Sequence, residues 1–220
     1  MRRIFFIITS ALLIQSSSAQ NIDRTKPPKP GPAPVIKIGD PTVYKLANGI
    51  TVLVVENHKL PKVTASYSID AGPITEGAKA GGLSLMGQML EEGTKLRSKA
   101  AFDEAVDRIG ARVGLSAGGG SASALTRYFD SAFMLMAEAL QKPSFTQSSL
   151  DKLKSQTLTN LKSNERSVPA VAGRVTSALL YGVNHPNGEF ATEESVTKLT
   201  LNDMEQFYKR KRIPEVAKPV

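Results

Sequence analysis

The sequence predicts an α+β fold in which an antiparallel sheet carries helices packed on one face. Strand-like patterns joined by tight turns form two groups, at residues 43–69 and 111–128. Helical patterns fill residues 78–110 and most of the chain after residue 131. Strands with short connections pair antiparallel, and helices that are grouped in blocks cover one face of such a sheet.

The first strand group begins with a hairpin and ends with an alternating strand. Residues 43–46 and 50–55 are apolar runs, and Asn48-Gly49 between them supplies the positive φ that a tight turn needs. Residues 63–69 alternate strictly between apolar and polar side chains. A period of two predicts a half-buried strand, so three strands are expected before the first helix.

Two helices follow. The first is expected over residues 78–92, with Leu83, Met86 and Leu90 at helical spacing and Gly93 as its stop. The second is expected to begin at the N-cap Ser98 and to end at residue 110.

The rest of the domain continues this order. We expect strands at residues 111–117 and 121–128, with the three glycines at 118–120 as their turn. Helices are predicted at residues 131–141, 147–165 and 170–181, followed by a loop at 182–188. Residues 200–203 resemble a capping box that opens a last helix.

The two ends of the chain predict export and a domain bounded by irregular segments. Residues 1–19 contain Arg2 and Arg3, an apolar run and small residues before a cleavage position, which is typical of a signal peptide. The apolar run is too short for a stable membrane span. Residues 20–39 form a proline-rich linker, residues 40–213 the domain, and residues 214–220 a tail. A periplasmic or extracellular protein is therefore expected.

Composition limits the chemistry that is available. The 220 residues include no Cys and only two His, His58 and His185, which excludes thiolate zinc sites and makes a site built wholly of His improbable. We expect no bound cofactor. The net charge of +8 is weak support for nucleic-acid binding in an exported protein, and none is expected.

Several short motifs, in this order and spacing, resemble the pitrilysin/insulinase family of zinc peptidases, which includes the mitochondrial processing peptidases. The resemblance covers about residues 40–213 and is carried by residues 46–50, 70–72, Glu76, 81–94, 141–145, 185–188 and 207–208. It implies a metallopeptidase-like half-domain, because subunits of this family contain two similar halves. It also implies that zinc is the cofactor of the active members.

The resemblance further implies which positions would carry the chemistry. Active members have H-x-x-E-H on the first long helix, where two His one turn apart hold zinc and the Glu is the general base. An ungapped alignment places Ser84, Gly87 and Gln88 at these positions. A hydroxyl, a hydrogen and an amide replace the three functional groups. The distal ligand position falls at Glu165, which is retained.

Other candidate residues are better explained without catalysis. Glu165 fits an exposed helical carboxylate, and the adjacent Glu91 and Glu92 fit a solvated pair. Ser84 has no base near it in sequence and no nucleophile-elbow motif. The run at residues 209–212 is interpreted as a solvated helix end, with an acidic partner as the alternative.

The pattern therefore predicts a peptidase-family protein with a degenerate zinc motif that is inactive on its own. The expected partner is an active zinc-peptidase homologue or a second half-domain, and a peptide substrate could bind along a sheet edge. A zinc metalloendopeptidase with rearranged ligands is the first alternative. A truncated, non-enzymatic binding module is the second, because the resemblance implies further strands after residue 213.

Overall fold

The computed structural model describes residues 31–32 and 40–212 of the chain. The chain divides into two units, Met1–Asp40 and Pro41–Val220, and the fold below belongs to the second. The signal peptide, the tail and nearly all of the linker lie outside the described residues and stay predictions. No helix within the described ranges is long and apolar enough to cross a membrane.

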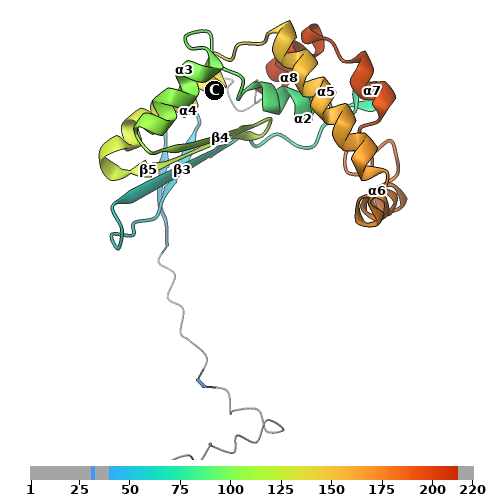
Figure 1. Ribbon diagram of the computed structural model, residues 1–220. Helices are drawn as coiled ribbons and strands as arrows, with labels where there is room; N and C mark the ends of the chain where they lie inside the picture. The colour runs from blue at the N-terminus through green and yellow to red at the C-terminus, as the bar shows by residue number, and fades with distance from the viewer. Residues whose placement is uncertain (1–30, 33–39, 213–220) are drawn as a thin grey trace, which may run out of the picture. The chain divides into compact units, whose positions relative to one another are not determined.

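The described strands form two antiparallel sheets (Figure 1). Strands β1 (Thr42–Lys45) and β2 (Thr51–Val54) pair only with each other. Strands β3 (Lys62–Ser68), β4 (Arg112–Ser116) and β5 (Gly119–Leu125) form the second sheet, in the order β3-β5-β4. The hairpin is thus a sheet of its own rather than an extension of the three-stranded sheet.

Helices account for most of the remainder. Their bounds are η1 (Gly77–Lys79), α2 (Gly82–Met89), α3 (Lys99–Arg108), η2 (Thr126–Tyr128), α4 (Phe129–Gln141), α5 (Gln147–Asn164), α6 (Val168–Tyr181), α7 (Glu193–Lys198) and α8 (Leu201–Arg212). Both η1 and η2 are short 3₁₀ segments. The α+β class and the antiparallel pairing are confirmed.

Small side chains let α4 lie close against the three-stranded sheet. Ala122 and Ala124 of β5 are buried against Ala132 and Met136 of α4. The adjacent face of α4 packs on α3, where Phe102 is buried with Leu135 and Ala139. Interiors are close-packed, so alanines on both surfaces bring the helix nearer to the sheet than larger side chains would.

A second core joins α2, α5 and α8. Its buried members are Leu85, Met86, Met89, Leu90, Leu150, Leu153, Leu199, Met204 and Phe207. The fit at the start of α2 is tight, because a Cβ added at Gly82 would lie 2.4 Å from Cε2 of Phe207. Burying each large apolar side chain contributes about 2 kcal/mol. Helix α2, on which the sequence analysis placed the zinc-motif positions, supplies Leu85, Met86 and Met89 to this core.

Two features of the helices differ from the sequence prediction. The first helix is divided, since η1 ends at Lys79 and α2 begins only after Gly81, which has φ of 94°. Helix α7 was not predicted. It is short, and it is opened by a capping box in which Thr192 and Ser195 exchange side-chain and backbone hydrogen bonds.

The turn between β4 and β5 is also shorter than predicted. Only Gly118 of the three glycines lies in the turn, whereas Gly119 and Gly120 begin β5. Gly119 has φ of 142°, and a Cβ added there would lie 2.0 Å from the carbonyl oxygen of Tyr67 in β3. The second glycine is required because β3 and β5 meet closely at this point.

Replacing Gly119 should therefore be far more harmful than replacing its neighbour. We expect Gly119→Ala to lower the free energy of unfolding by at least about 2 kcal/mol. Alanine would be strained at this φ angle, and its Cβ would collide with β3. Gly118→Ala is the matched control, since its nearest atom would be Ser116 Oγ at 3.9 Å. Denaturant unfolding of both variants measures the difference, and equal losses would contradict this account.

Candidate functional site

The two positions that the sequence analysis aligned with zinc-binding histidines share one face of α2. Ser84 and Gln88 are both exposed, one helical turn apart. The Gln88 Nε2 lies 3.4 Å from the Ser84 carbonyl oxygen and 3.5 Å from Ser84 Oγ. The amide and hydroxyl are turned toward each other, and neither is a ligand that zinc prefers.

The third position is occupied by protein backbone. Gly87 is buried, and a Cβ added there would lie 2.7 Å from the backbone nitrogen of Ala117 and 3.3 Å from the carbonyl carbon of Ser116. Real Cβ atoms do not approach backbone this closely. The end of β4 and its turn therefore fill the space that any longer side chain at position 87 would need.

Carboxylates hold the start of α2 in place. The Leu83 N–H donates to Glu76 Oε2 at 2.7 Å, which caps the helix. The two oxygens of Glu189 accept from the N–H groups of Glu76 and Gly77, at 2.8 and 2.9 Å. Burial raises the pKa of Glu76; the bond from Leu83 opposes the rise and the charge of Glu189 adds to it.

The end of α2 is fixed by the two adjacent acidic residues. Glu91 Oε1 accepts a hydrogen bond from the Leu115 N–H of β4 at 3.3 Å. Glu92 forms an ion pair with Lys152 of α5, and its side chain is only 11% exposed. The expectation of a solvated pair therefore holds for Glu91, which is exposed, and is wrong for Glu92, which joins two helices.

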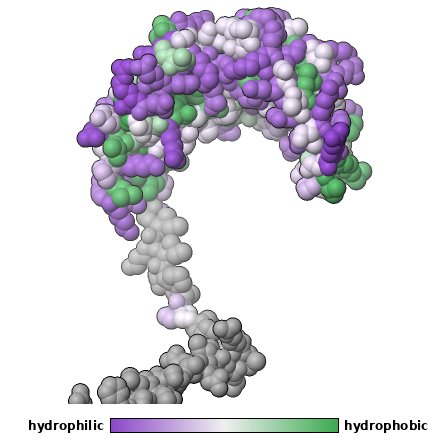
Figure 2. All heavy atoms as spheres, in the orientation of Figure 1, coloured by the Kyte–Doolittle hydropathy of each residue, from purple (hydrophilic) through white to green (hydrophobic). Residues whose placement is uncertain are grey.

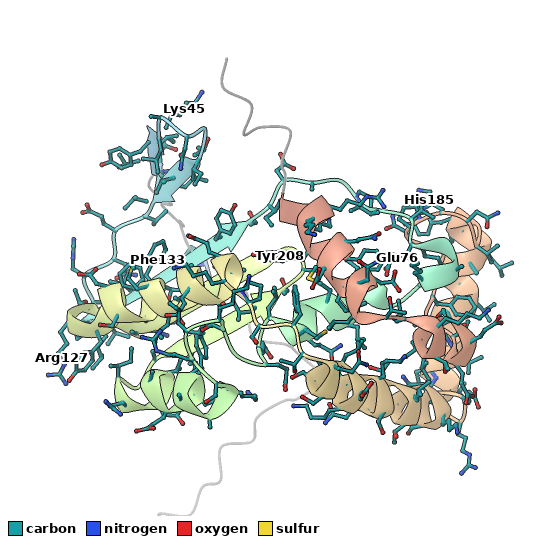
Figure 3. The ribbon with its side chains drawn as sticks, turned by 90° about the horizontal axis from the view of Figure 1, so that it is seen from above. Lys45, Glu76, Arg127, Phe133, His185 and Tyr208 are labelled. Carbon is teal, nitrogen blue, oxygen red and sulfur yellow. The ribbon has the colours of Figure 1, made fainter. Side chains whose placement is uncertain are left out.

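The remaining metal-ligand candidates are not brought together. Glu165 is an exposed residue at the C-cap of α5. His58 is exposed after β2, with Nε2 3.3 Å from Glu56 Oε2. His185 stacks on Tyr181 after α6, with ring centroids 5.4 Å apart, and is labelled in Figure 3. Among residues 31–32 and 40–212, no group of three acidic, Cys or His residues could hold a metal.

The side chains at the predicted zinc positions therefore do not fit the metal. Two neutral side chains and a glycine cannot supply the charge or the ligand count that catalytic zinc requires. Glu165 adds one carboxylate, and the structure places it at the far end of α5.

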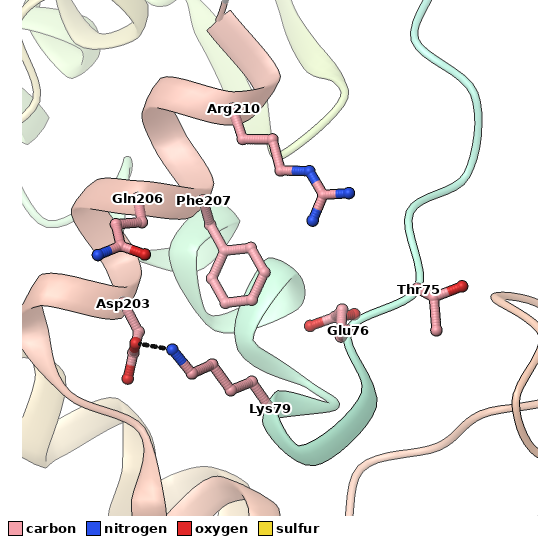
Figure 4. A pocket seen from close by; sticks show the side chains of 7 residues that line it. All are labelled: Thr75, Glu76, Lys79, Asp203, Gln206, Phe207 and Arg210. Atoms are coloured by element: carbon pink, nitrogen blue, oxygen red, sulfur yellow. Dashed lines mark hydrogen bonds and ion pairs between the residues drawn. The ribbon is translucent and has the colours of Figure 1, made fainter.

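A polar pocket that the sequence did not predict lies between η1 and α8. It has a volume of about 150 Å³ and is lined by Thr75, Glu76, Lys79, Asp203, Gln206, Phe207 and Arg210 (Figure 4). Lys79 forms an ion pair with Asp203, whose side chain is 7% exposed. The two residues of this pair are more than a hundred positions apart in the sequence, so only the fold brings them to notice.

Asp203 has a second task at the start of α8. Its Oδ2 accepts from the N–H and hydroxyl of Thr200, at 2.9 and 2.8 Å, as the predicted capping box requires. Burial would raise the pKa of Asp203, but the bonds from Lys79 and Thr200 outweigh it and hold the pKa below its usual value.

The cationic run at the end of α8 is only partly solvated. Lys209 and Arg210 are exposed, and Arg210 reaches the pocket described above, as Figure 4 shows. Lys211 is only 8% exposed. The expectation of a wholly solvated helix end is therefore too simple.

Comparison with known families identifies the family to which the chain belongs. The model of the insulinase family, peptidase family M16, matches residues 51–187. The chain belongs to this family. The matched stretch includes β2 to α6, and with them residues 84, 87 and 88 of α2.

Its M16 relatives include proteins described as inactive. "Non-peptidase homolog YmxG" of Helicobacter pylori is 27% identical over 164 residues, covering 71% of this chain and 38% of that protein. The fold matches a peptidase M16 inactive domain from Pseudomonas fluorescens with a TM-score of 0.68 and 26% identity, over 77% of this chain and 43% of that one.

Two more distant M16-like structures show the fold alone. A protease from Helicobacter pylori matches with a TM-score of 0.68 and 17% identity, over 81% of this chain and 45% of that one. The periplasmic protease PqqL from Escherichia coli matches with a TM-score of 0.65 and 16% identity, over 83% and 22%. The chain spans less than half the length of each of these four relatives.

Filling the space at Gly87 should destabilise the fold. An alanine normally favours a helix by about 1 kcal/mol over glycine. At Gly87 we expect the reverse, a loss of about 1–3 kcal/mol, because the methyl group would press on the Ala117 backbone. Gly173→Ala in α6 is the matched control, since nothing lies within 4 Å of its Cβ position and the substitution should not destabilise.

The same contact predicts that the zinc motif cannot be restored by three substitutions. We expect the variant S84H/G87E/Q88H to lose stability and to bind no stoichiometric zinc. Unfolding curves and metal analysis after dialysis against zinc measure both properties. A stable, zinc-loaded triple variant would show that β4 moves aside and would contradict the packing argument.

The Lys79–Asp203 pair should make the free energy of unfolding depend on pH in the acidic range. Because the pKa of Asp203 is lowered on folding, its contribution is fully present above the unfolded value near 3.8 and is lost as pH falls through the folded value. The difference in unfolding free energy between wild type and Asp203→Asn should therefore shrink below about pH 4. Asp107→Asn, an exposed change in α3, is the control. A constant difference would contradict the coupling.

Proposed function

We propose that the chain is an exported, non-catalytic member of the insulinase family that binds an extended peptide beside an active zinc peptidase or a second half-domain. The observation that carries the proposal is the contact of Gly87 with the Ala117 backbone. A chain that had merely lost its ligands would leave the site open. Here the strand end packs where a general base would stand, while the M16 scaffold around it is kept.

The relatives support a role without catalysis. The Helicobacter protein at 27% identity is named a non-peptidase homolog, and the Pseudomonas structure at 26% identity is described as an inactive domain. Export rests on residues 1–19, where two arginines precede an apolar run and small residues. No observation favours the alternative of a zinc peptidase with rearranged ligands.

The three-stranded sheet offers one open edge for a peptide. The β4 edge is partly covered, because Glu91 takes the Leu115 N–H and α2 lies against Ala117. Strand β3 pairs with β5 on one side and, among the described residues, with no strand on the other. An unpaired strand edge accepts an extended peptide through backbone hydrogen bonds.

The pairing pattern identifies which groups of β3 face outward. The Ile69 N–H donates to the Gly118 carbonyl at 2.9 Å, on the β5 side. Because N–H groups alternate in direction along a strand, those of Thr64 and Ser66 point away from β5. These are the donors that an added strand would use.

The proposal is tested by mixing the purified chain with an active M16 peptidase and an extended peptide substrate. We expect co-purification or a changed rate of peptide turnover, and no hydrolysis by the chain alone. Absence of both association and any effect on turnover would overturn the proposal. Stoichiometric zinc together with peptide hydrolysis by the chain alone would favour the rearranged-ligand alternative instead.

A single proline tests whether the β3 edge is used. Ser66→Pro removes an outward donor without breaking the ladder to β5, so the fold should survive. Peptide or partner binding should weaken by about 1 kcal/mol or more, the value of one backbone hydrogen bond. Ser66→Ala keeps the N–H and is the matched control. Equal binding by the two variants would show that this edge is not the contact surface.

A further inference from the structure

The pocket between η1 and α8 is small and polar. Hydrophobic residues gather over α6 (Figure 2), whereas the described residues that line this pocket are polar or charged, apart from Phe207. Its volume of about 150 Å³ is below the range of sites for drug-sized ligands. The pocket therefore has room only for a small molecule that forms hydrogen bonds or ion pairs.

Two of the four charges in the pocket neutralise each other. Lys79 forms an ion pair with Asp203. The Oδ2 of Asp203 accepts two further hydrogen bonds, both from Thr200. This pair is therefore satisfied within the fold. The charges that a ligand could meet are those of Glu76 on the η1 side and Arg210 on the α8 side.

Glu76 is a half-buried carboxylate, and in the part of the chain that the structure describes it has no cation beside it. Its Oε2 accepts from the Leu83 N–H at 2.7 Å. The carboxylate of Glu189 lies close by, where the N–H groups of Glu76 and Gly77 hold it. Burial raises the pKa of Glu76, and the charge of Glu189 adds to the rise. An ammonium group in the pocket would relieve both effects.

Arg210 brings the opposite charge to the same space. In Figure 4 its guanidinium and the Glu76 carboxylate point into the pocket from opposite sides, with the Phe207 ring beside them. Among residues 40–212, Arg210 forms neither an ion pair nor a hydrogen bond. A guanidinium can bind a carboxylate through two parallel N–H donors. The Arg210 side of the pocket therefore fits a carboxylate.

The two unpaired charges are complementary to one kind of ligand. No bond joins Glu76 to Arg210 in the described structure, so a gap separates the negative group from the positive one. A molecule with an ammonium and a carboxylate close together would bridge this gap. A ligand with a single charge would leave the other group of the pocket partly desolvated and unpaired, which costs affinity. The Phe207 ring offers an apolar wall for a short aliphatic side chain.

We propose that the pocket between η1 and α8 binds a free α-amino acid with an aliphatic side chain. Its ammonium pairs with Glu76 and its carboxylate with Arg210. The inference does not depend on the proposed function, because strand β3, to which the peptide is assigned, contributes no described residue to this pocket.

Isothermal titration calorimetry of the full chain with L-leucine is the test. We expect a dissociation constant of about 1 mM or lower, which is reasonable for a ligand of this size that forms two ion pairs. Leucinamide lacks the carboxylate and N-acetyl-leucine lacks the ammonium, so each should bind about tenfold more weakly or worse. Absence of binding at millimolar L-leucine, or equal affinity for the three compounds, would overturn the proposal.

Two variants assign the two charges. Arg210→Gln should weaken L-leucine binding about tenfold and leave leucinamide binding unchanged, because leucinamide has no carboxylate. Glu76→Gln should weaken L-leucine binding to a similar extent and leave N-acetyl-leucine binding unchanged. The new amide oxygen can still accept from the Leu83 N–H, so the start of α2 is kept. Circular dichroism confirms that both variants are folded.

Matched controls come from the same helix. Lys209→Gln and Glu205→Gln remove the same charges from exposed residues of α8 that do not line the pocket, and both should leave L-leucine binding unchanged. Full affinity in Arg210→Gln, or an equal loss in Lys209→Gln, would contradict the proposal.

A double-mutant cycle excludes the competing arrangement. If Arg210 and Glu76 paired with each other in solution, Arg210→Gln and Glu76→Gln would be coupled in the free energy of unfolding without ligand. We expect no such coupling, and a clear one would overturn the proposal. None of these measurements involves peptide turnover by an active M16 peptidase, so failure of the amino-acid site would leave the peptide-binding proposal standing.

Discussion

The close approach of α2 to the turn between β4 and β5 is the constraint on which most of this structure depends. Gly87 allows it, because any side chain would meet the Ala117 backbone. Other residues of α2 are buried against α5 and α8. This short helix therefore connects the sheet to the second core. Glu91 reinforces the same junction from the helix end through the Leu115 N–H. Leu115 and Leu140 pack against both cores and extend the junction.

The elements of the fold were largely predictable because their signals are local. Alternation at residues 62–68, the N-cap at Ser98 and the capping residues Thr200 and Asp203 each depend on near neighbours, and the structure contains all of them. The start of α2 was not predictable, because it is set by Glu76 and Glu189, which lie far apart in sequence. Helix α7 is too short for a periodic signal.

The candidate site was likewise predictable only where its features depend on neighbouring residues. Helical spacing was sufficient to place positions 84 and 88 on one face, and the structure agrees. It could not show what occupies the space beside position 87, because the Ala117 backbone comes from another element. A glycine in the middle of a buried helix was the one available signal, since it costs stability unless something packs closely against it. The missing side chain at position 87 and the close approach of the Ala117 backbone therefore belong to the same contact.

The β1–β2 hairpin has a consequence for how the chain melts. Within the part of the chain that the structure describes, its two strands pair only with each other, and Val43, Leu53 and Val55 are more than half exposed. A two-stranded hairpin without a core is marginally stable in water. The hairpin therefore opens with little free energy while α2, α5 and α8 remain packed. Unfolding of this chain is therefore expected to depart from a single all-or-none event, with a local probe at Tyr44 and a global helix signal reporting different transitions.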